Sequence, residues 1–339
     1  QLRSASRLTA QRACQPPLIH DVGSHMLSRQ QQFKRARARC GQWIAAIALT
    51  LASATFVLAA TPVLKLTLQS ISVAGVKRWF IVVKPESLPP GAPVVLLLHG
   101  GTQSMHKVLD SHALSAWSQA AKAQGFILVV PNGTSAKGGN TAGNRQNWND
   151  GRSDSAAGDQ VADDVTFLTL LVDWALREYG ADARRVFITG ASNGGMMTYR
   201  MLIERPTALL IVNGTADPVM PWSGGRIAPG NRGTVLSADA TKRWWLQTNH
   251  VNQTPALSDL PDLVPNDDCR MQREDFPALP GGAPVAFITM QGGGHYAPSQ
   301  LAPQRTGRLV KRIVGKPCRD AEAVDLAWQF FQQSAEYAR

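Results

Sequence analysis

Cysteine is scarce in this sequence. Only four occur among 339 residues, and two of them, Cys14 and Cys40, lie within the first sixty. The other two, Cys269 and Cys318, are far apart and lack the short spacings that mark a zinc site. Because a lone pair of thiols holds zinc poorly, we expect no metal.

The N-terminal region lacks a hydrophobic run long enough to cross a membrane. Its apolar stretch, Trp43 to Leu58, has about sixteen residues, whereas a transmembrane helix needs about 20. The basic run Lys34 to Arg39 precedes this stretch, and the small residues Ala59 and Ala60 end it. This order is typical of a secretory signal peptide. We favour cleavage near Ala59 or Ala60 over a membrane anchor, and expect a secreted or periplasmic protein with no stable membrane anchor after cleavage.

The first sixty residues also differ from the rest in pattern. Residues 1 to 25 show no hydrophobic periodicity, and Met26 is a natural initiator. We interpret residues 1 to 60 as an upstream extension followed by the signal peptide, and residues 61 to 339 as one domain. The hydrophobic content of 44% is enough for one large core or two modest ones.

A large excess of positive charge is missing outside this segment. Residues 1 to 60 hold eight Lys and Arg against a single Asp, so they supply +7 of the formal +11 and leave +4 for the remainder. So small an excess does not indicate a nucleic-acid partner.

Export bears on the two remaining cysteines. In an oxidising compartment a single pair of cysteines usually forms a disulfide. We therefore expect Cys269 and Cys318 to be bonded, with two separate buried thiols as the alternative.

What the sequence does contain is an apolar strand, a Gly-x-Ser-x-Gly turn and the start of a helix, over residues 186 to 197. A serine hydroxyl is a weak nucleophile, so a catalytic serine is held at the tip of a sharp turn where a histidine can take its proton. Gly190 and Gly194 suit such a turn because larger residues would collide with the adjoining strand and helix. The pattern predicts Ser192 as a nucleophile and the backbone amide of Asn193 as half of an oxyanion hole. An ordinary glycine-rich turn is the alternative.

Two further loops are candidates for the same site. The apolar strand 94 to 98 ends in His99-Gly100-Gly101-Thr102, and we expect the amide of Gly101 or Thr102 to be the second oxyanion donor. A plain strand-to-helix turn is the alternative, and His99 is interpreted as a structural hydrogen-bonding residue. The polar stretch 134 to 160 is long for a loop within a domain. Its Trp148 either lines the substrate cleft or pins the loop to the core.

The other members of a catalytic triad follow Ser192 in the sequence. Asp217 comes after an apolar run at 209 to 212, and His295 after one at 285 to 290. The order Ser, Asp, His, with each residue beyond a strand end, is that of the α/β-hydrolases. We expect His295 to take the Ser192 proton and Asp217 to orient the imidazole. Asp163 and Asp164 precede the serine and are interpreted as helix cap residues.

Six motifs carry a resemblance to one known family: Leu98-His99-Gly100-Gly101-Thr102-Gln103, Trp148-Asn149-Asp150-Gly151-Arg152, Asp163-Asp164-Val165, residues 185 to 197, Asn213-Gly214-Thr215-Ala216-Asp217-Pro218 and Gly292-Gly293-Gly294-His295. Over roughly residues 66 to 335 the chain resembles the secreted poly(3-hydroxybutyrate) depolymerase and feruloyl esterase family. The resemblance implies an α/β-hydrolase fold, a mainly parallel sheet with helices on both faces. It also implies a carboxylic-ester hydrolase without a cofactor, with Ser192, Asp217 and His295 as the triad and Asn193 as an oxyanion donor.

The sequence departs from this family after the nucleophile helix. About forty residues, and with them one parallel strand, are missing where Glu204-Arg205-Pro206-Thr207 runs into Ala208-Leu209-Leu210. Two connecting residues span at most about 7 Å, less than the roughly 10 Å needed to pass an empty strand position. We therefore expect the strand that carries Asp217 to move into the empty slot and pair with the strand before Ser192.

The expected function is that of a secreted serine esterase of the polyhydroxyalkanoate depolymerase or feruloyl/acyl esterase type. Its substrate would be a polyester oligomer or an aryl or acyl ester, since no polymer-binding domain is evident after His295. The alternative is a catalytically impaired relative that acts as a binding protein or is a truncated relic. A serine peptidase of the same fold shares the triad but has no supporting feature in the sequence.

Overall fold

The computed structural model describes residues 64–135, 139–154, 162–204, 208–230, 232–303 and 307–337. All of them belong to the unit formed by residues 61–339. The predicted upstream extension and signal peptide, with Cys14 and Cys40, lie outside the described residues. Each helix in the described ranges is too short or too polar to cross a membrane.

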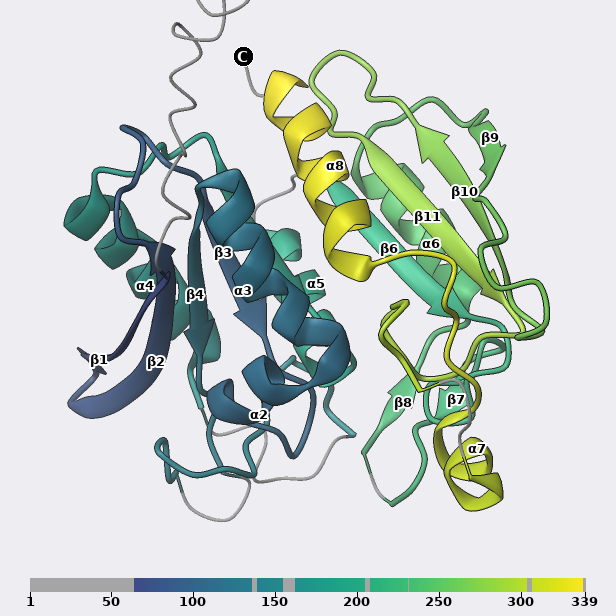
Figure 1. The fold of residues 1–339 in the computed structure, drawn as a ribbon, viewed down its shortest axis with the longest axis horizontal. Coiled ribbons are helices and arrows are strands. Elements are labelled where there is room, and N and C mark those ends of the chain that lie inside the picture. The colour runs from purple at the N-terminus through teal and green to yellow at the C-terminus, as the bar shows by residue number, and fades with distance from the viewer. Residues whose placement is uncertain are drawn as a thin grey trace, which may run out of the picture. The chain divides into compact units, whose positions relative to one another are not determined.

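The first half of the described chain forms a five-stranded sheet (Figure 1). Its strands are β1 (Leu64–Val73), β2 (Val76–Pro85), β3 (Val94–Leu98), β4 (Ile127–Pro131) and β5 (Val186–Gly190). Their order is β1-β2-β4-β3-β5, with β3 parallel to both β4 and β5. Strands β1 and β2 form an antiparallel hairpin at the sheet edge. Positive φ angles at Ala74 (47°) and Gly75 (81°) suit its two-residue turn.

Helices cover both faces of this sheet. They are α2 (Met105–Asp110), α3 (His112–Gln124), α4 (Asp164–Tyr179) and α5 (Asn193–Glu204). Because successive side chains of a strand point to opposite faces, Leu97 packs in the core that contains Trp117 of α3, and Leu96 in the core that contains Phe167 of α4. All residues of β3 and β4 are buried, as their continuous apolar runs predict.

A second, four-stranded sheet holds the later part of the chain. Its strands are β6 (Leu209–Gly214), β9 (Ala256–Asp259), β10 (Arg270–Phe276) and β11 (Val285–Gln291). Their order is β6-β11-β10-β9, in which β6 and β11 are parallel and the other neighbours antiparallel. The remaining elements are β7 (Gly225–Arg226), β8 (Thr234–Val235), α6 (Ala238–Thr248), α7 (Arg308–Val314) and α8 (Ala323–Tyr337).

Helix α8 packs against the cores of both sheets (Figure 1). Phe331 stacks on Phe187 of β5 with ring centroids 4.5 Å apart, and Trp328 stacks on Phe126 at 4.6 Å. On the other side, Leu326 packs in the core that contains Ile288 of β11. One amphipathic helix therefore holds the two sheets together.

The strand that carries Asp217 does not pair with the strand before Ser192, so that prediction was wrong. Within the described residues, β5 is hydrogen-bonded to β3 alone and β6 to β11 alone. The prediction assumed two connecting residues, but α5 ends at Glu204 and β6 begins at Leu209. The four residues between them can span up to about 13 Å, enough to pass one empty strand position of roughly 10 Å. Each sheet combines parallel and antiparallel strand pairs, and the arrangement of sheets and helices agrees with the predicted α/β fold class.

Asp163 caps α4 as predicted, but Asp164 has a different role. The Asp163 carboxylate accepts the backbone amide of Thr166. Asp164 is fully buried, where it accepts the Arg78 guanidinium at 2.6 Å and the Asn149 amide at 2.7 Å. Since a buried carboxylate needs such partners, Asp164 joins α4 to β2 and to the loop that contains Asn149.

Replacing Asp164 by Asn is expected to lower the free energy of unfolding by about 3 to 5 kcal/mol, because the Arg78 charge would remain buried without its partner. Urea denaturation monitored by circular dichroism measures the change. Asp163→Asn is the control: Asn caps a helix as well as Asp does, so its loss should stay below about 1 kcal/mol. Equal losses in the two variants would contradict the assignment.

Candidate active site

Ser192 lies in the sharp turn between β5 and α5, with a positive φ of 56°. A Cβ atom on Gly190 would lie 2.6 Å from the carbonyl carbon of Gly194, and one on Gly194 would lie 2.4 Å from the carbonyl oxygen of Leu98. Both approaches are closer than real Cβ contacts allow, so only glycine fits at these two positions. The turn thus presents the serine at the carboxyl end of β5 in the strained conformation of a nucleophile elbow.

Asp217 and His295 are brought together by the parallel pairing of β6 and β11. Asp217 Oδ2 lies 2.7 Å from His295 Nδ1. The other carboxylate oxygen accepts the backbone amides of Val219 and Met220, at 2.7 and 2.9 Å. These bonds fix the carboxylate, and a carboxylate acceptor places the imidazole proton on Nδ1 and leaves Nε2 as a base.

Ser192 and the Asp217–His295 pair line one cleft with a volume of about 1280 Å³. Its walls include every residue of β5 and of β6, two strands whose facing edges are unpaired in the described structure. No hydrogen bond joins Ser192 to His295 among the described residues. The first sheet therefore supplies the nucleophile and the second sheet the acid–base pair, on opposite walls of the cleft.

The loop after β3, residues 99–104, carries both candidates for the second oxyanion donor, and we call it the oxyanion loop. Its hydrogen bonds distinguish between the two amides. The amide of Thr102, where φ is 62°, already donates to Asn147 Oδ1 at 2.8 Å. Thr102 is therefore not free to act as the donor predicted from the sequence. The backbone amides of Gly101 and Asn193 have no acceptor within the described part of the chain. A Cβ on Gly101 would lie 3.5 Å from the Asn193 Cβ, so these two residues are neighbours.

Comparisons with known proteins agree with this arrangement. The prolyl oligopeptidase family matches residues 112–225, about a third of the chain. Feruloyl esterase C of Emericella nidulans is 28% identical over 260 residues, which cover 68% of this chain and 82% of that protein. The chain is thus similar to esterase-type hydrolases of the α/β-hydrolase superfamily.

Two other relatives match over shorter stretches of this chain. The bifunctional acetylxylan esterase/xylanase of Neocallimastix patriciarum is 26% identical over 172 residues, which cover 44% of this chain and 22% of that protein. The oxidized polyvinyl alcohol hydrolase of a Sphingopyxis species is 30% identical over 145 residues, which cover 38% of this chain and 40% of that protein. The chain thus spans less than half the length of these two relatives.

Trp148 does not line the cleft of the hydrolase, which corrects the expectation of a substrate-binding role. Its side chain is 1% exposed, and its indole N–H donates to the carbonyl of His99 at 2.8 Å. The Trp148 backbone amide donates to Asn193 Oδ1, and Asn193 Nδ2 donates to the Trp148 carbonyl and to Asp150 Oδ2. Trp148 is buried because its loop is clamped between the oxyanion loop and the nucleophile helix.

Sequence reasoning missed two residues of this clamp. Asn147 holds the amide of Thr102, and Asp150 binds both Asn193 and the guanidinium of Arg152, the latter at 2.6 Å. Both belong to the polar run around Trp148, whose unusual density of Asn and Asp was the available signal. This clamp, formed by Asn147, Trp148 and Asp150, joins the loop that contains Gly101 to Asn193. The backbone amides of Gly101 and Asn193 are the remaining candidate donors to an oxyanion.

His99 has a structural role, in agreement with its interpretation from the sequence. Its Nε2 accepts the amide of Gly133 at 3.0 Å, and Nδ1 lies 2.8 Å from the Gly100 carbonyl. Burial lowers the pKa of His99 from 6.5 to about 4. The ring is therefore neutral near pH 7, and both nitrogens are occupied.

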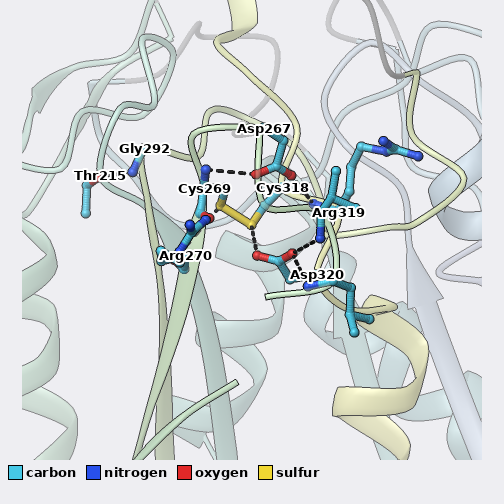
Figure 2. The surroundings of a disulfide bond; sticks show 10 residues. Thr215, Asp267, Cys269, Arg270, Gly292, Cys318, Arg319 and Asp320 are labelled. Carbon is cyan, nitrogen blue, oxygen red and sulfur yellow. Dashed lines mark hydrogen bonds between the residues drawn. A yellow bond between two sulfur atoms is a disulfide. The ribbon is translucent and has the colours of Figure 1, made fainter. Parts of the chain in front are cut away.

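Cys269 and Cys318 form a disulfide (Figure 2). Together with Asp320, these two cysteines form the cluster of potential metal-ligand side chains found among the described residues. Because both sulfur atoms are bonded to each other, they are not available as thiolate ligands.

The neutral state of His99 predicts a pH dependence of stability. Between pH 6.5 and about 4, His99 is protonated in the unfolded chain but neutral in the folded chain, and this difference favours unfolding. The contribution of neutral His99 to the free energy of unfolding is therefore complete above pH 6.5 and is lost as pH falls. The loss from pH 7 to pH 4 is about 3 kcal/mol. Denaturant unfolding across this range should show a smaller decrease in His99→Gln than in the native hydrolase; parallel curves would rule the assignment out.

Removing the Asn147 side chain should loosen the oxyanion loop. We expect Asn147→Ala to lower kcat for a short-chain nitrophenyl ester by about tenfold or more with little change in KM, since a donor displaced from the oxyanion is lost mainly in the transition state. Asn144→Ala is the control, because Asn144 bonds Ser104 on the same loop without contacting Gly101 or Thr102. Similar kinetics in the two variants would contradict the role of Asn147 in holding the oxyanion loop.

Proposed function

We propose that this hydrolase is a serine carboxylic-ester hydrolase that uses Ser192, His295 and Asp217. The observation that carries the proposal is the 2.7 Å contact between His295 and Asp217, on the wall of the same cleft that Ser192 lines. The strained turn at Ser192 supports it, because such strain is retained where a function requires it.

The reaction is acyl transfer. Ser192 Oγ attacks the ester carbonyl carbon while His295 Nε2 takes its proton, and the amides of Gly101 and Asn193 stabilise the oxyanion. The C–O bond then breaks, and His295 returns the proton to the leaving alcohol. Water, deprotonated by His295, attacks the acyl-enzyme and releases the acid and Ser192. The step requires Ser192 and His295 to approach within hydrogen-bond distance across the cleft, a contact that often tightens only with substrate bound.

The lining of the cleft supports an ester with an aromatic or apolar group. Trp222, Trp244, Tyr296 and Met220 line it in addition to the triad, and aromatic side chains contribute large apolar contact areas. An aryl or acyl ester, or a short polyester oligomer, is the proposed substrate, and relatives named as feruloyl and acetylxylan esterases are in keeping with this class. Export by the predicted signal peptide is part of the same proposal.

A peptidase is the second candidate, favoured by the match of residues 112–225 to the prolyl oligopeptidase family. The same triad could cleave a peptide bond, because attack and oxyanion stabilisation are common to ester and amide hydrolysis. Turnover of a proline-containing peptide anilide, compared with that of a nitrophenyl ester, separates the two.

The test is labelling of residues 61–339 by a fluorophosphonate probe, with ester turnover measured in parallel. Ser192→Ala should abolish labelling, and it should lower kcat at least about 10⁴-fold because the nucleophile is lost. Folded protein, verified by circular dichroism, that neither labels nor turns over ester would overturn the proposal. It would favour a catalytically impaired binding protein or relic.

A further inference from the structure

The His295 loop lies against a separate segment, residues 314–320, which we call the strap. The Gly294 amide donates to the carbonyl of Lys316 at 2.7 Å, and the His295 amide donates to the carbonyl of Val314 at 2.6 Å. Two consecutive backbone bonds therefore hold the loop that carries the imidazole on the strap.

The strap and the loop are in direct backbone contact at Gly315. A Cβ on Gly315 would lie 2.6 Å from the Gly294 Cα and 3.1 Å from the carbonyl oxygen of Ala216, the residue before Asp217. The first contact is closer than real Cβ atoms approach, and the second is tighter than most of them. The position of the strap thus affects both members of the Asp217–His295 pair.

The strap is itself anchored to the start of β10 by the disulfide. Cys318 bonds Cys269, and both residues are buried, with exposures of 0% and 1%. Figure 2 shows Asp267 beside this bond, where one carboxylate oxygen accepts the Cys269 amide at 2.9 Å and the other accepts the Arg319 amide at 3.2 Å. Asp320, the last residue of the strap, accepts hydrogen bonds from the backbone amides of Leu263 and Val264. Covalent and polar bonds together fix the strap to the second sheet.

We propose that Cys269, Cys318 and Gly315 are positioning residues for the reaction. The disulfide fixes the strap, and the strap, through its contact at Gly315, holds the His295 imidazole on Asp217 and aimed into the cleft. The proposal rests on the proposed function of the same site, because it assigns these residues to the geometry of that triad.

Gly315→Ala tests the contact without touching the disulfide, and Gly281→Ala is its matched control. The two glycines have nearly equal φ angles, 78° and 77°, but a Cβ on Gly281 has no atom within 4 Å. Both variants thus place a side chain at a positive φ. The collision with the His295 loop is specific to Gly315, where a ψ of −157° adds further backbone strain. A Cys269→Ser/Cys318→Ser double variant and Asp267→Ala loosen the strap at its anchor.

The readouts are kcat and KM for a short-chain nitrophenyl ester and the rate at which Ser192 reacts with a fluorophosphonate. Both are measured well below the melting temperature of each variant. Gly315→Ala should lower kcat and the labelling rate about 10- to 100-fold, with KM within about twofold because ester binding is not altered. The anchor variants should change in the same direction, whereas Gly281→Ala should match the native protein.

The outcomes separate this inference from the proposed function. If the native protein turns over ester but any folded strap variant keeps native kcat and labelling rate, losing only thermal stability, the strap is merely structural and the inference is overturned. Should Gly315→Ala fail to fold, the anchor variants decide in the same way. If the native protein and Gly281→Ala neither label nor turn over ester, the proposed function itself fails.

Discussion

The parallel ladder between β6 and β11 is the interaction on which the acid–base half of the site depends. It pairs Leu209 through Gly214 with Val285 through Met290, so both strands end at the same level. The loops beyond them meet so closely that a Cβ on Gly214 would lie 2.4 Å from the carbonyl oxygen of Gly293. A shift of this register would separate the carboxylate from the imidazole, because each is only a few residues beyond its strand end.

The nucleophile depends on a different set of contacts. Ser192 is held by β5, which pairs with β3, and by glycine contacts between the elbow and the end of β3. The clamp through Asn147, Trp148 and Asn193 then ties the oxyanion loop to the same helix. Each half of the site is thus rigid in its own sheet, and the distance between the halves is set by how the sheets pack. Side-chain packing against α8 determines that distance, since β5 and β6 do not share a ladder in the described residues.

Sequence patterns predicted most of the elements and the order of the site residues. Continuous apolar runs marked β3, β6 and β11, and Asp163 marked the start of α4. These features are local, because a few adjacent residues determine them. The occupied amide of Thr102, the burial of Trp148 and the ion pair of Asp164 with Arg78 depend on partners 45 or more residues away. No local pattern specifies such partners. The pairing of β6 was mispredicted because the prediction assumed two connecting residues where four join α5 to β6.

The stacking of α8 on β5 also has a consequence for how the chain is made. Phe331 and Trp328 follow every core side chain of the described residues outside α8. They stack on Phe187 and Phe126, which come much earlier in the sequence. As the chain leaves the ribosome, each sheet can form its own ladder early, since its strands are then already present. The two walls of the cleft can be joined only after residue 331 has emerged. Until then Phe187 and Phe126 lack these stacking partners, and uncovered apolar side chains of this kind favour wrong contacts during synthesis.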